Sequence, residues 1–269
     1  MRWEKLQRAN LTVIGTLKKV LFYLVLVILW ELAYRGGTVY FSFWNVNYFP
    51  SPLEVIKRLV VLFTSTKLWS YIADSLNTVF IGYAISIVLG ILTGFIITHF
   101  KFLNENLIGL LLGLQTLPNV CWLPFAILWF GENQKAVIFV IAIGSIFAIS
   151  LGTISGINNI NPVYIKSAKS LGAKGVKAYI NVIIPASLPG IISGLKQGWL
   201  FAWRALMSGE MLLATRGLGK VLLEGRENQD IVQIVAVMFV IIAIGILVEA
   251  LVFKRIEAGI RERWGLNKC

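Results

Sequence analysis

Residues 158–189 read NNINPVYIKSAKSLGAKGVKAYINVIIPASLP and separate two long apolar stretches of the chain. The segment is too polar to span a bilayer and contains no acidic residue, but it carries four lysines, Lys166, Lys169, Lys174 and Lys177. Pro162 suits the first turn of a helix that Gly172 closes. A second helix is expected from Lys174 to Ile184, ending at Pro185. The segment is therefore predicted to form a helical hairpin.

Such a hairpin can fill a groove on a partner protein. Ala168 and Gly172 are four residues apart, so on a helix they share one face and would form a smooth strip for close contact with another backbone. The alternative is a re-entrant hairpin that only connects two spans.

The composition places the chain in a membrane. Of its 269 residues, 57% are hydrophobic and 14% are charged, and the mean hydropathy is +0.78. A soluble domain is about 25% charged, so this composition could not build a water-exposed surface. The net charge of +12 is explained better by basic cytoplasmic loops than by nucleic-acid binding. Cys121 lies in an apolar stretch and Cys269 is the last residue, so neither a disulfide framework nor a metal site is predicted.

Six stretches are long and apolar enough to cross a bilayer, because a span needs about 20 mostly apolar residues. They are residues 18–35, 73–98, 107–130, 136–157, 190–211 and 231–253. No small-residue cleavage site follows the first stretch, so we interpret it as an uncleaved span. If the spans alternate, lysine and arginine are in excess on the side that holds both termini and the hairpin, which makes that side cytoplasmic.

We interpret the chain as one all-α, multi-pass membrane protein. Residues 1–17 form a cytoplasmic N-terminal segment, 18–257 a transmembrane domain and 258–269 a cytoplasmic tail, with 158–189 as a cytoplasmic loop. A serine and a proline before Glu54 are typical of a helix start, so a short interfacial helix is expected over 53–62.

Glycines spaced four residues apart predict close packing between spans, because lipid provides no hydrophobic drive for helices to associate. They are Gly90 and Gly94, Gly152 and Gly156, and the series Gly190, Gly194 and Gly198. This spacing indicates a packed bundle and does not identify a function.

Ionisable residues in the fifth span are candidates for a solute path, since each is costly in the bilayer core unless it faces a partner or water. Lys196 and Arg204 lie within about 80° of each other on a helix and about 12 Å apart along it, which suits an anionic solute. Trp199 and Trp203 share that face and could line a pore. Alternatively, Arg204 could pair with Glu210 at the outer interface and Lys196 could extend to the inner one. Helix packing would then explain the tryptophans.

Two prolines interrupt the third span. Pro118 and Pro124 bracket Asn119 and Trp122, and they break a helical hydrogen-bond ladder where irregular backbone is tolerated only if it is buried or faces a cavity. Gln115, Thr116 and Asn119 could offer polar contacts to a solute at this break. A kink that serves only packing is the alternative. The predicted path residues are Gln115, Pro118, Asn119, Trp122, Lys196, Trp199, Trp203, Arg204 and Glu210.

The hairpin sequence KSAKSLG, followed after nine residues by VIIP, resembles the cytoplasmic EAA loop of the membrane-spanning subunits of ABC importers. The pattern of that loop is Glu-Ala-Ala, three residues, Gly, nine residues, Ile, one residue, Leu-Pro. Ala168, Gly172 and Pro185 match it, and Ser167 is a small replacement for alanine. Lys166 stands where the pattern has glutamate.

The resemblance covers residues 49–264. It includes FPSPLEV from Phe49, LPNVCWLPFAILWFG from Leu117, and AWRALMSGEM from Ala202 with RGLG after it, which are similar to stretches of the sulfonate, taurine and nitrate subfamily. It implies a type I ABC importer permease fold whose coupling helices touch the ATPase. The implied coupling residues are Lys166, Ser167, Ala168, Leu171, Gly172, Ala173 and Pro185.

The resemblance also implies partners. They are a second copy of this chain, two ATP-binding cassette subunits and an extracytoplasmic solute-binding protein, in a bacterial-type cytoplasmic membrane. The chain lacks the Gly-x-x-x-x-Gly-Lys-Ser/Thr loop that binds ATP phosphates, so it is expected to be non-catalytic and to bind no cofactor itself. ATP and magnesium would be bound by the ATPase subunits.

Several alternatives stay open at this point. An aliphatic sulfonate is the leading candidate for the solute, and nitrate, taurine or a thiamin-precursor-like molecule are the others. A secondary transporter working alone would show two similar halves with interrupted helices, which we do not find. A membrane-embedded enzyme would need a cluster of His, Asp, Glu or Cys within the spans, and the sequence does not contain one.

Overall fold

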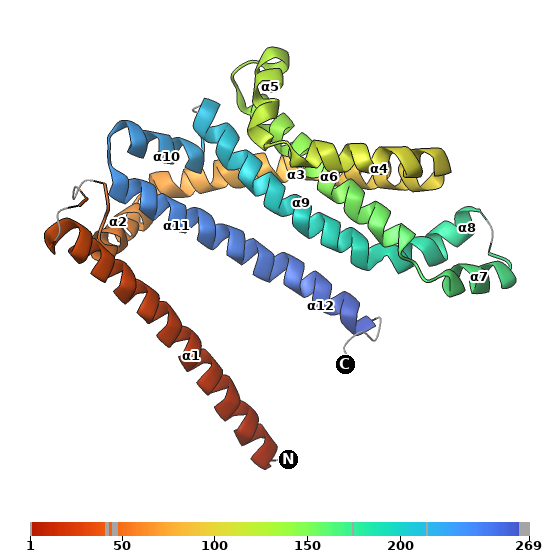
Figure 1. Cartoon of the computed structure of the whole chain (residues 1–269), viewed down its shortest axis with the longest axis horizontal. Coiled ribbons are helices and arrows are strands. Elements are labelled where there is room, and N and C mark those ends of the chain that lie inside the picture. The colour runs from red at the N-terminus through yellow and green to blue at the C-terminus, as the bar shows by residue number, and fades with distance from the viewer. Residues whose placement is uncertain (1, 41–42, 45–47, 174, 214, 264–269) are drawn as a thin grey trace. The chain divides into compact units, whose positions relative to one another are not determined.

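The computed structural model describes residues 2–40, 43–44, 48–173, 175–213 and 215–263, with side chains from residue 17 onward except at Val39, Arg261 and Arg263. Within these ranges all regular elements are helical, which confirms the predicted fold class (Figure 1). Lys174 and the end of the predicted tail, 264–269, lie outside them. The chain divides into two compact units, residues 1–65 with 224–238 and residues 66–223 with 239–269.

The first unit contains the N-terminal helices. Its elements are α1 (Arg2–Tyr34), the π-helix η1 (Arg35–Tyr40), α2 (Pro52–Thr64) and the start of α11 (Ile231–Val248). The Ser51 hydroxyl accepts a hydrogen bond from the Glu54 N–H, and the Glu54 carboxylate accepts one from the Ser51 N–H, each at 3.2 Å. This capping box explains why α2 begins here and confirms the short helix predicted over 53–62. Arg58 of α2 forms an ion pair with Asp230.

The second unit holds the rest of α11 and the remaining helices, except that the last four residues of α10 fall in the first unit. They are α3 (Thr66–His99), α4 (Lys101–Thr116), the 3₁₀-helix η2 (Asn119–Trp122), α5 (Leu123–Phe130), α6 (Gln134–Asn158), α7 (Pro162–Ser170), α8 (Val176–Ala178), the π-helix η3 (Tyr179–Ile183), α9 (Ile184–Leu213), α10 (Leu218–Glu227), the π-helix η4 (Glu249–Phe253) and α12 (Lys254–Arg263). Helices α3, α6 and α9 run side by side (Figure 1) and form the centre of this unit.

Glycine makes this close packing possible, as the spacing predicts. A Cβ added at Gly194 of α9 would lie 2.8 Å from the Cα of Gly152 in α6, and one added at Gly156 would lie 2.7 Å from the carbonyl oxygen of Ser187. Gly90 of α3 packs in the same way, because a Cβ there would lie 2.8 Å from that of Ile149. The backbones of α6 and α9 therefore meet with no side chain between them.

Among the described residues, four helical stretches are long and apolar enough to cross a membrane, namely 66–99, 134–158, 176–213 and 231–260. The bent pair of α4 with η2 and α5 makes a fifth if it is one span. These five account for all the predicted spans except the first. The first, 18–35, lies within α1, which is not among them, so the count of six stays a prediction.

The third predicted span, 107–130, is not a straight helix. Helix α4 ends at Thr116, Pro118 follows, and the chain turns by 98° before η2 and α5 continue. The predicted break at Pro118 is therefore confirmed. Pro124 lies in the first turn of α5, where a missing N–H costs no hydrogen bond, and it breaks nothing.

The expectation that the second hairpin helix ends at Pro185 is wrong. Residues 176–213 form one helical stretch of 38 residues through α8, η3 and α9. A proline ring normally meets the carbonyl four residues before it. That residue is Asn181, which lies in the π-helical turn η3, where wider i→i+5 bonding replaces the regular ladder. The helix therefore continues past Pro185.

Candidate functional site

Helix α9 has two faces of different character. Its buried face is made of small residues and of the aromatic side chains Trp199 and Trp203. The opposite face exposes Ser193, Gln197, Leu200 and Arg204, which lie within about 60° of one another at 100° per residue. The side chains of Ser193, Gln197 and Arg204 form no hydrogen bond or ion pair with any other described residue. We call these four residues the α9 stripe.

The α9 stripe differs from the other exposed helix faces. Between Phe80 and Ile96, the exposed residues of α3 are all apolar. The same is true of α11 from Phe239 to Leu247. Apolar faces suit lipid, whereas an arginine and a glutamine within a span need water or protein partners. Of the exposed faces of α3, α9 and α11, the α9 stripe is therefore the one least suited to lipid contact.

Lys196 lies beside the stripe and is already paired. Its Nζ is 2.9 Å from Oε1 of Glu249 in η4, and both side chains are about one-third exposed. Glu249 therefore offsets the charge of Lys196, and a role of Lys196 in the solute path stays a prediction. Arg204 is the unpaired cation of this region among the described residues.

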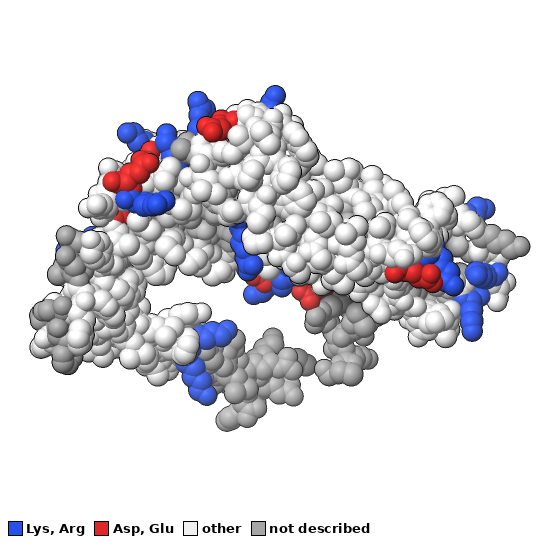
Figure 2. Space-filling model, turned by 45° about the horizontal axis from the view of Figure 1, so that its top comes forward, with Lys and Arg blue, Asp and Glu red and all other residues white. Residues whose placement is uncertain are grey.

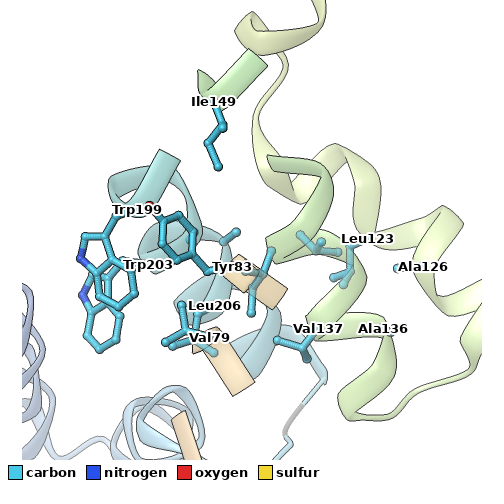
Figure 3. Close-up of a cluster of buried hydrophobic side chains, with 14 of the residues drawn as sticks. Val79, Tyr83, Leu123, Ala126, Ala136, Val137, Ile149, Trp199, Trp203 and Leu206 are labelled. Atoms are coloured by element: carbon cyan, nitrogen blue, oxygen red, sulfur yellow. The ribbon is translucent and has the colours of Figure 1, made fainter. Parts of the chain in front are cut away.

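Trp199 and Trp203 do not line an open path in this structure. Trp199 is 2% exposed and Trp203 9%, and their rings stack with centroids 5.9 Å apart (Figure 3). Tyr83 of α3 meets the Trp199 ring edge-on at 5.4 Å and donates a hydrogen bond to the Leu195 carbonyl at 2.6 Å. The two tryptophans belong to the packed core, which favours the packing alternative.

The break after α4 is joined to α9 by a polar contact. Asn119 is half-buried, and its Nδ2 donates a hydrogen bond to the carbonyl of Phe201 at 3.2 Å. Its side chain occupies the space next to Gly144, where an added Cβ would lie 2.7 Å from Oδ1. Trp122 packs on Phe147 of α6, with ring centroids 6.3 Å apart.

Of the remaining predicted residues at this break, Gln115 is half-buried and Pro118 is exposed. Asn119 and Trp122 are turned toward α9 and α6, where they hold the bent segment against these two helices. A packing role therefore accounts for both side chains.

Glu210 is buried in a hydrogen-bonded cluster and is only 1% exposed. Its carboxylate accepts hydrogen bonds from the Ser75 hydroxyl, at 2.8 and 2.9 Å from the two oxygens, and from the Gly219 N–H at 2.8 Å. The Ser75 hydroxyl accepts a bond from the Leu218 N–H at 2.9 Å. The alternative pairing of Glu210 with Arg204 is not found among the described residues, because Arg204 lies on the exposed face.

This Glu210 cluster holds the start of α10 against α3 and α9. Leu218 and Gly219 are the first two residues of α10, where N–H groups lack helical partners. A carboxylate at a helix N-terminus satisfies such donors and interacts favourably with the helix dipole. Gly217 has φ of +123°, and any side chain at Gly217 or Gly219 would overlap Glu210. The glycines of the sequence RGLG are thus explained by the buried carboxylate.

The hairpin predicted from the sequence is present, and its first helix, α7, ends in a Schellman motif. The Gly172 N–H donates to the Lys169 carbonyl at 3.0 Å, and the Ala173 N–H donates to the Ala168 carbonyl at 2.9 Å. Gly172 has φ of +84°, a conformation that favours glycine. Leu171 precedes it at the tip and is 88% exposed.

The predicted smooth strip of Ala168 and Gly172 is not formed as expected. Ala168 is only 7% exposed, because it lies on the side of α7 that faces the returning helix, where it lines a hollow of about 530 Å³. Gly172 is exposed at the tip, Lys166 and Ser167 are exposed on α7, and Pro185 is half-buried. The predicted coupling residues therefore lie together in one hairpin, but they do not share one surface.

No group of three His, Cys, Asp or Glu side chains that could hold a metal occurs among the residues with described side chains. The geometry is that of a packed helical bundle with a polar helix face and a protruding hairpin, and it offers no catalytic constellation in the described parts of the chain.

Comparison with known proteins identifies the family. Residues 59–262 match the family of binding-protein-dependent transport system inner membrane components, and the chain belongs to it. It is a multi-pass membrane protein and a permease subunit of an ABC importer, without catalytic activity of its own.

Two relatives show the range of the family. A putative ABC transporter permease of Methanocaldococcus jannaschii is 30% identical over 228 residues, 83% of each chain. A putative aliphatic sulfonates transport permease of Escherichia coli K12 is 29% identical over 219 residues, 81% of each chain. Among solved structures, an inward-facing MetNI methionine ABC transporter gives a TM-score of 0.58 at 16% identity, covering 76% of this chain and 97% of that one, and supports the fold.

Three residues of interest were not predicted. Ser193 and Gln197 complete the α9 stripe, and they could have been found from helical periodicity, because they precede Arg204 by eleven and seven residues and so lie within about 20° of it on a helix. Ser75 holds Glu210 across 135 residues of sequence, and no local pattern indicates that contact.

Proposed function

We propose that this permease subunit forms the membrane path for a small anionic solute, with an aliphatic sulfonate as the first candidate. The observation that carries the proposal is the α9 stripe, a polar helix face with an exposed Arg204 between apolar faces. A guanidinium presents planar hydrogen-bond donors that match the oxygens of a sulfonate, nitrate or carboxylate. The similarity to a permease described for aliphatic sulfonates supports the same class.

We propose further that two copies of the chain enclose the path. A polar stripe on one helix cannot by itself shield a solute from lipid. A second copy facing it would place two Arg204 side chains around one pathway. Closed point-group symmetry is the rule for such assemblies. Taurine, nitrate and a thiamin-precursor-like solute are the alternative cargoes.

The hairpin is the proposed contact with the ATPase subunits, which would bind ATP and magnesium. The coupling residues proposed are Lys166, Ser167, Ala168, Leu171, Gly172, Ala173 and Pro185. The helical stretch 176–213 supports this role, because it joins the hairpin to the α9 stripe without a loop between them. Packed helices move as bodies, so a movement of the hairpin can reach the stripe directly.

The excess of lysine and arginine on one side supports cytoplasmic termini and a cytoplasmic hairpin in this arrangement. The solute-binding protein would then deliver its cargo at the opposite, outer side.

The test is uptake into vesicles that contain this chain, its ATPase subunits and the solute-binding protein. Arg204→Ala should lower kcat/KM for uptake of an alkanesulfonate by about tenfold or more, since a hydrogen bond to a charged group contributes about 1.5–3 kcal/mol. Arg204→Lys keeps the positive charge and should lower kcat/KM less than Arg204→Ala does. Arg216, an exposed arginine outside the stripe, provides the matched control as Arg216→Ala. Equal uptake by the Arg204→Ala and control variants would refute the proposed path.

A further inference from the structure

The hairpin carries positive charge without any compensating negative charge. No aspartate or glutamate occurs between Glu132 and Glu210. Lys166, Lys169 and Lys177 are exposed, and none of them forms an ion pair with another described residue. Figure 2 shows blue, basic side chains at the surface of the part that contains α7 and α8. The charge of this surface is therefore available to a partner.

The same surface has an apolar part. Leu171 at the tip is 88% exposed and Val176 is 73% exposed. Between the two arms lies the hollow of about 530 Å³, lined mainly by apolar side chains, with Lys169 at its edge and Tyr179 of the returning helix in its wall. Exposed apolar residues next to cations match an apolar groove that has acidic residues on its rim.

We infer that the ATPase subunit that receives this hairpin has a groove with carboxylates on its rim, and that Lys166 and Lys169 pair with them. This inference rests on the proposed function, because it takes the hairpin as the ATPase contact. Lys166 and Lys169 are three residues apart on α7, so their side chains project from neighbouring positions on the helix and can reach the same rim. An acidic rim at this position would fit the lysine that stands where the family pattern has glutamate.

A lipid surface is the other anionic partner that such lysines could meet. Helix α7 fits that role less well, because it is nine residues long and exposes polar residues on several sides, such as Ser167 and Ser170. A helix that lies in a membrane interface needs a continuous apolar face opposite its basic one. The protein partner is therefore the one we propose.

The experiment measures binding of the purified ATPase subunits to the full-length chain in phospholipid nanodiscs. Lys166→Glu and Lys169→Glu should each raise the Kd by about tenfold or more, which corresponds to about 1.4 kcal/mol. Lys19→Glu changes an exposed lysine of α1 and is the matched control. Binding of the wild-type chain should weaken as salt rises from about 50 to about 500 mM, and Lys166→Gln should reduce that dependence.

The inference would be overturned if Lys166→Glu and Lys169→Glu had the same Kd as the control and binding showed no salt dependence. The lysines would then act only as determinants of membrane orientation. Unchanged ATPase affinity combined with lost binding to vesicles containing anionic phospholipid would also overturn it, in favour of lipid. If the wild-type chain binds no ATPase subunit, the proposed coupling itself fails, which is a different outcome. Recovery of Lys166→Glu by a carboxylate-to-lysine change in the ATPase groove would establish the pairing.

Discussion

Glu210→Ala should destabilise the protein more than any change at an exposed charged residue nearby. The substitution removes the acceptor of two buried donors, the Ser75 hydroxyl and the Gly219 N–H. A buried polar group left without a partner costs about 1–3 kcal/mol. The two together give a loss of about 2–6 kcal/mol in the free energy of unfolding, before any cost of the cavity left by the side chain.

Glu210→Gln separates hydrogen bonding from volume. Glutamine fills the same space and its oxygen accepts one hydrogen bond, but its NH₂ group faces a donor where the second carboxylate oxygen accepted one. We expect a loss of about 1–3 kcal/mol for this variant, smaller than for Glu210→Ala. Arg216→Ala, in the same connection between α9 and α10, should change the free energy of unfolding little, because Arg216 is exposed.

The assay is denaturant unfolding in detergent micelles, followed by the fluorescence of the nine tryptophans, which include Trp199 and Trp203 of the core. Unfolding of Glu210→Ala at the same denaturant concentration as Arg216→Ala would refute the role assigned to the Glu210 cluster. A second measurement distinguishes the cluster from the solute path. At a temperature where Glu210→Ala is still folded, its KM for solute should match that of the wild-type chain, and a raised KM with unchanged stability would place Glu210 in the path.

Three other substitutions test the packing, the hairpin and the ion pair. Gly194→Leu should prevent assembly of α6 against α9 and leave little folded protein on size-exclusion chromatography, whereas Gly113→Leu, where an added Cβ meets nothing within 4 Å, should be folded normally. Gly172→Leu should abolish solute-stimulated ATP hydrolysis while the chain still inserts into the membrane, because the φ of +84° disfavours a bulky side chain at the tip. Gly172→Asn should keep part of the ATPase stimulation. Full stimulation of the leucine variant would contradict the role of Gly172. Lys196→Gln should leave uptake of an anionic solute far less affected than Arg204→Ala, since Glu249 already offsets the lysine charge, and an equal loss of uptake in the two variants would argue against that interpretation.

Local patterns in the sequence predicted local structure well. Ser51 and Pro52, followed by Glu54 in the first turn, predicted where α2 begins, and Pro118 predicted the break after α4. The glycine series predicted the close contact of α6 with α9, because only glycine permits backbones to approach so closely. Each of these features depends on residues within a few positions of one another, or on one property of glycine.

Contacts between distant parts of the chain were not predicted. Charge alone suggested that Lys196 and Arg204 act together, but Glu249 is 53 positions away from Lys196 and no pattern in α9 indicates their pairing. Helical periodicity places Trp199 on the same side as Lys196, yet it does not say which side faces the core. Packing against α3 and α6 decides which side of α9 is buried. It places the two tryptophans on the buried side and leaves Ser193 and Gln197 exposed.

The unbroken course of the helix from Val176 to Leu213 has a mechanical consequence. At 1.5 Å per residue, its 38 residues make a rod about 57 Å long. Gly194, which packs directly against the backbone of α6 at Gly152, lies at its midpoint. If the rod tilts as a body by about 10° about this point of contact, its two ends are displaced by about 5 Å in opposite directions. If this helix lines the solute path, the path would then narrow at one membrane surface whenever it widens at the other.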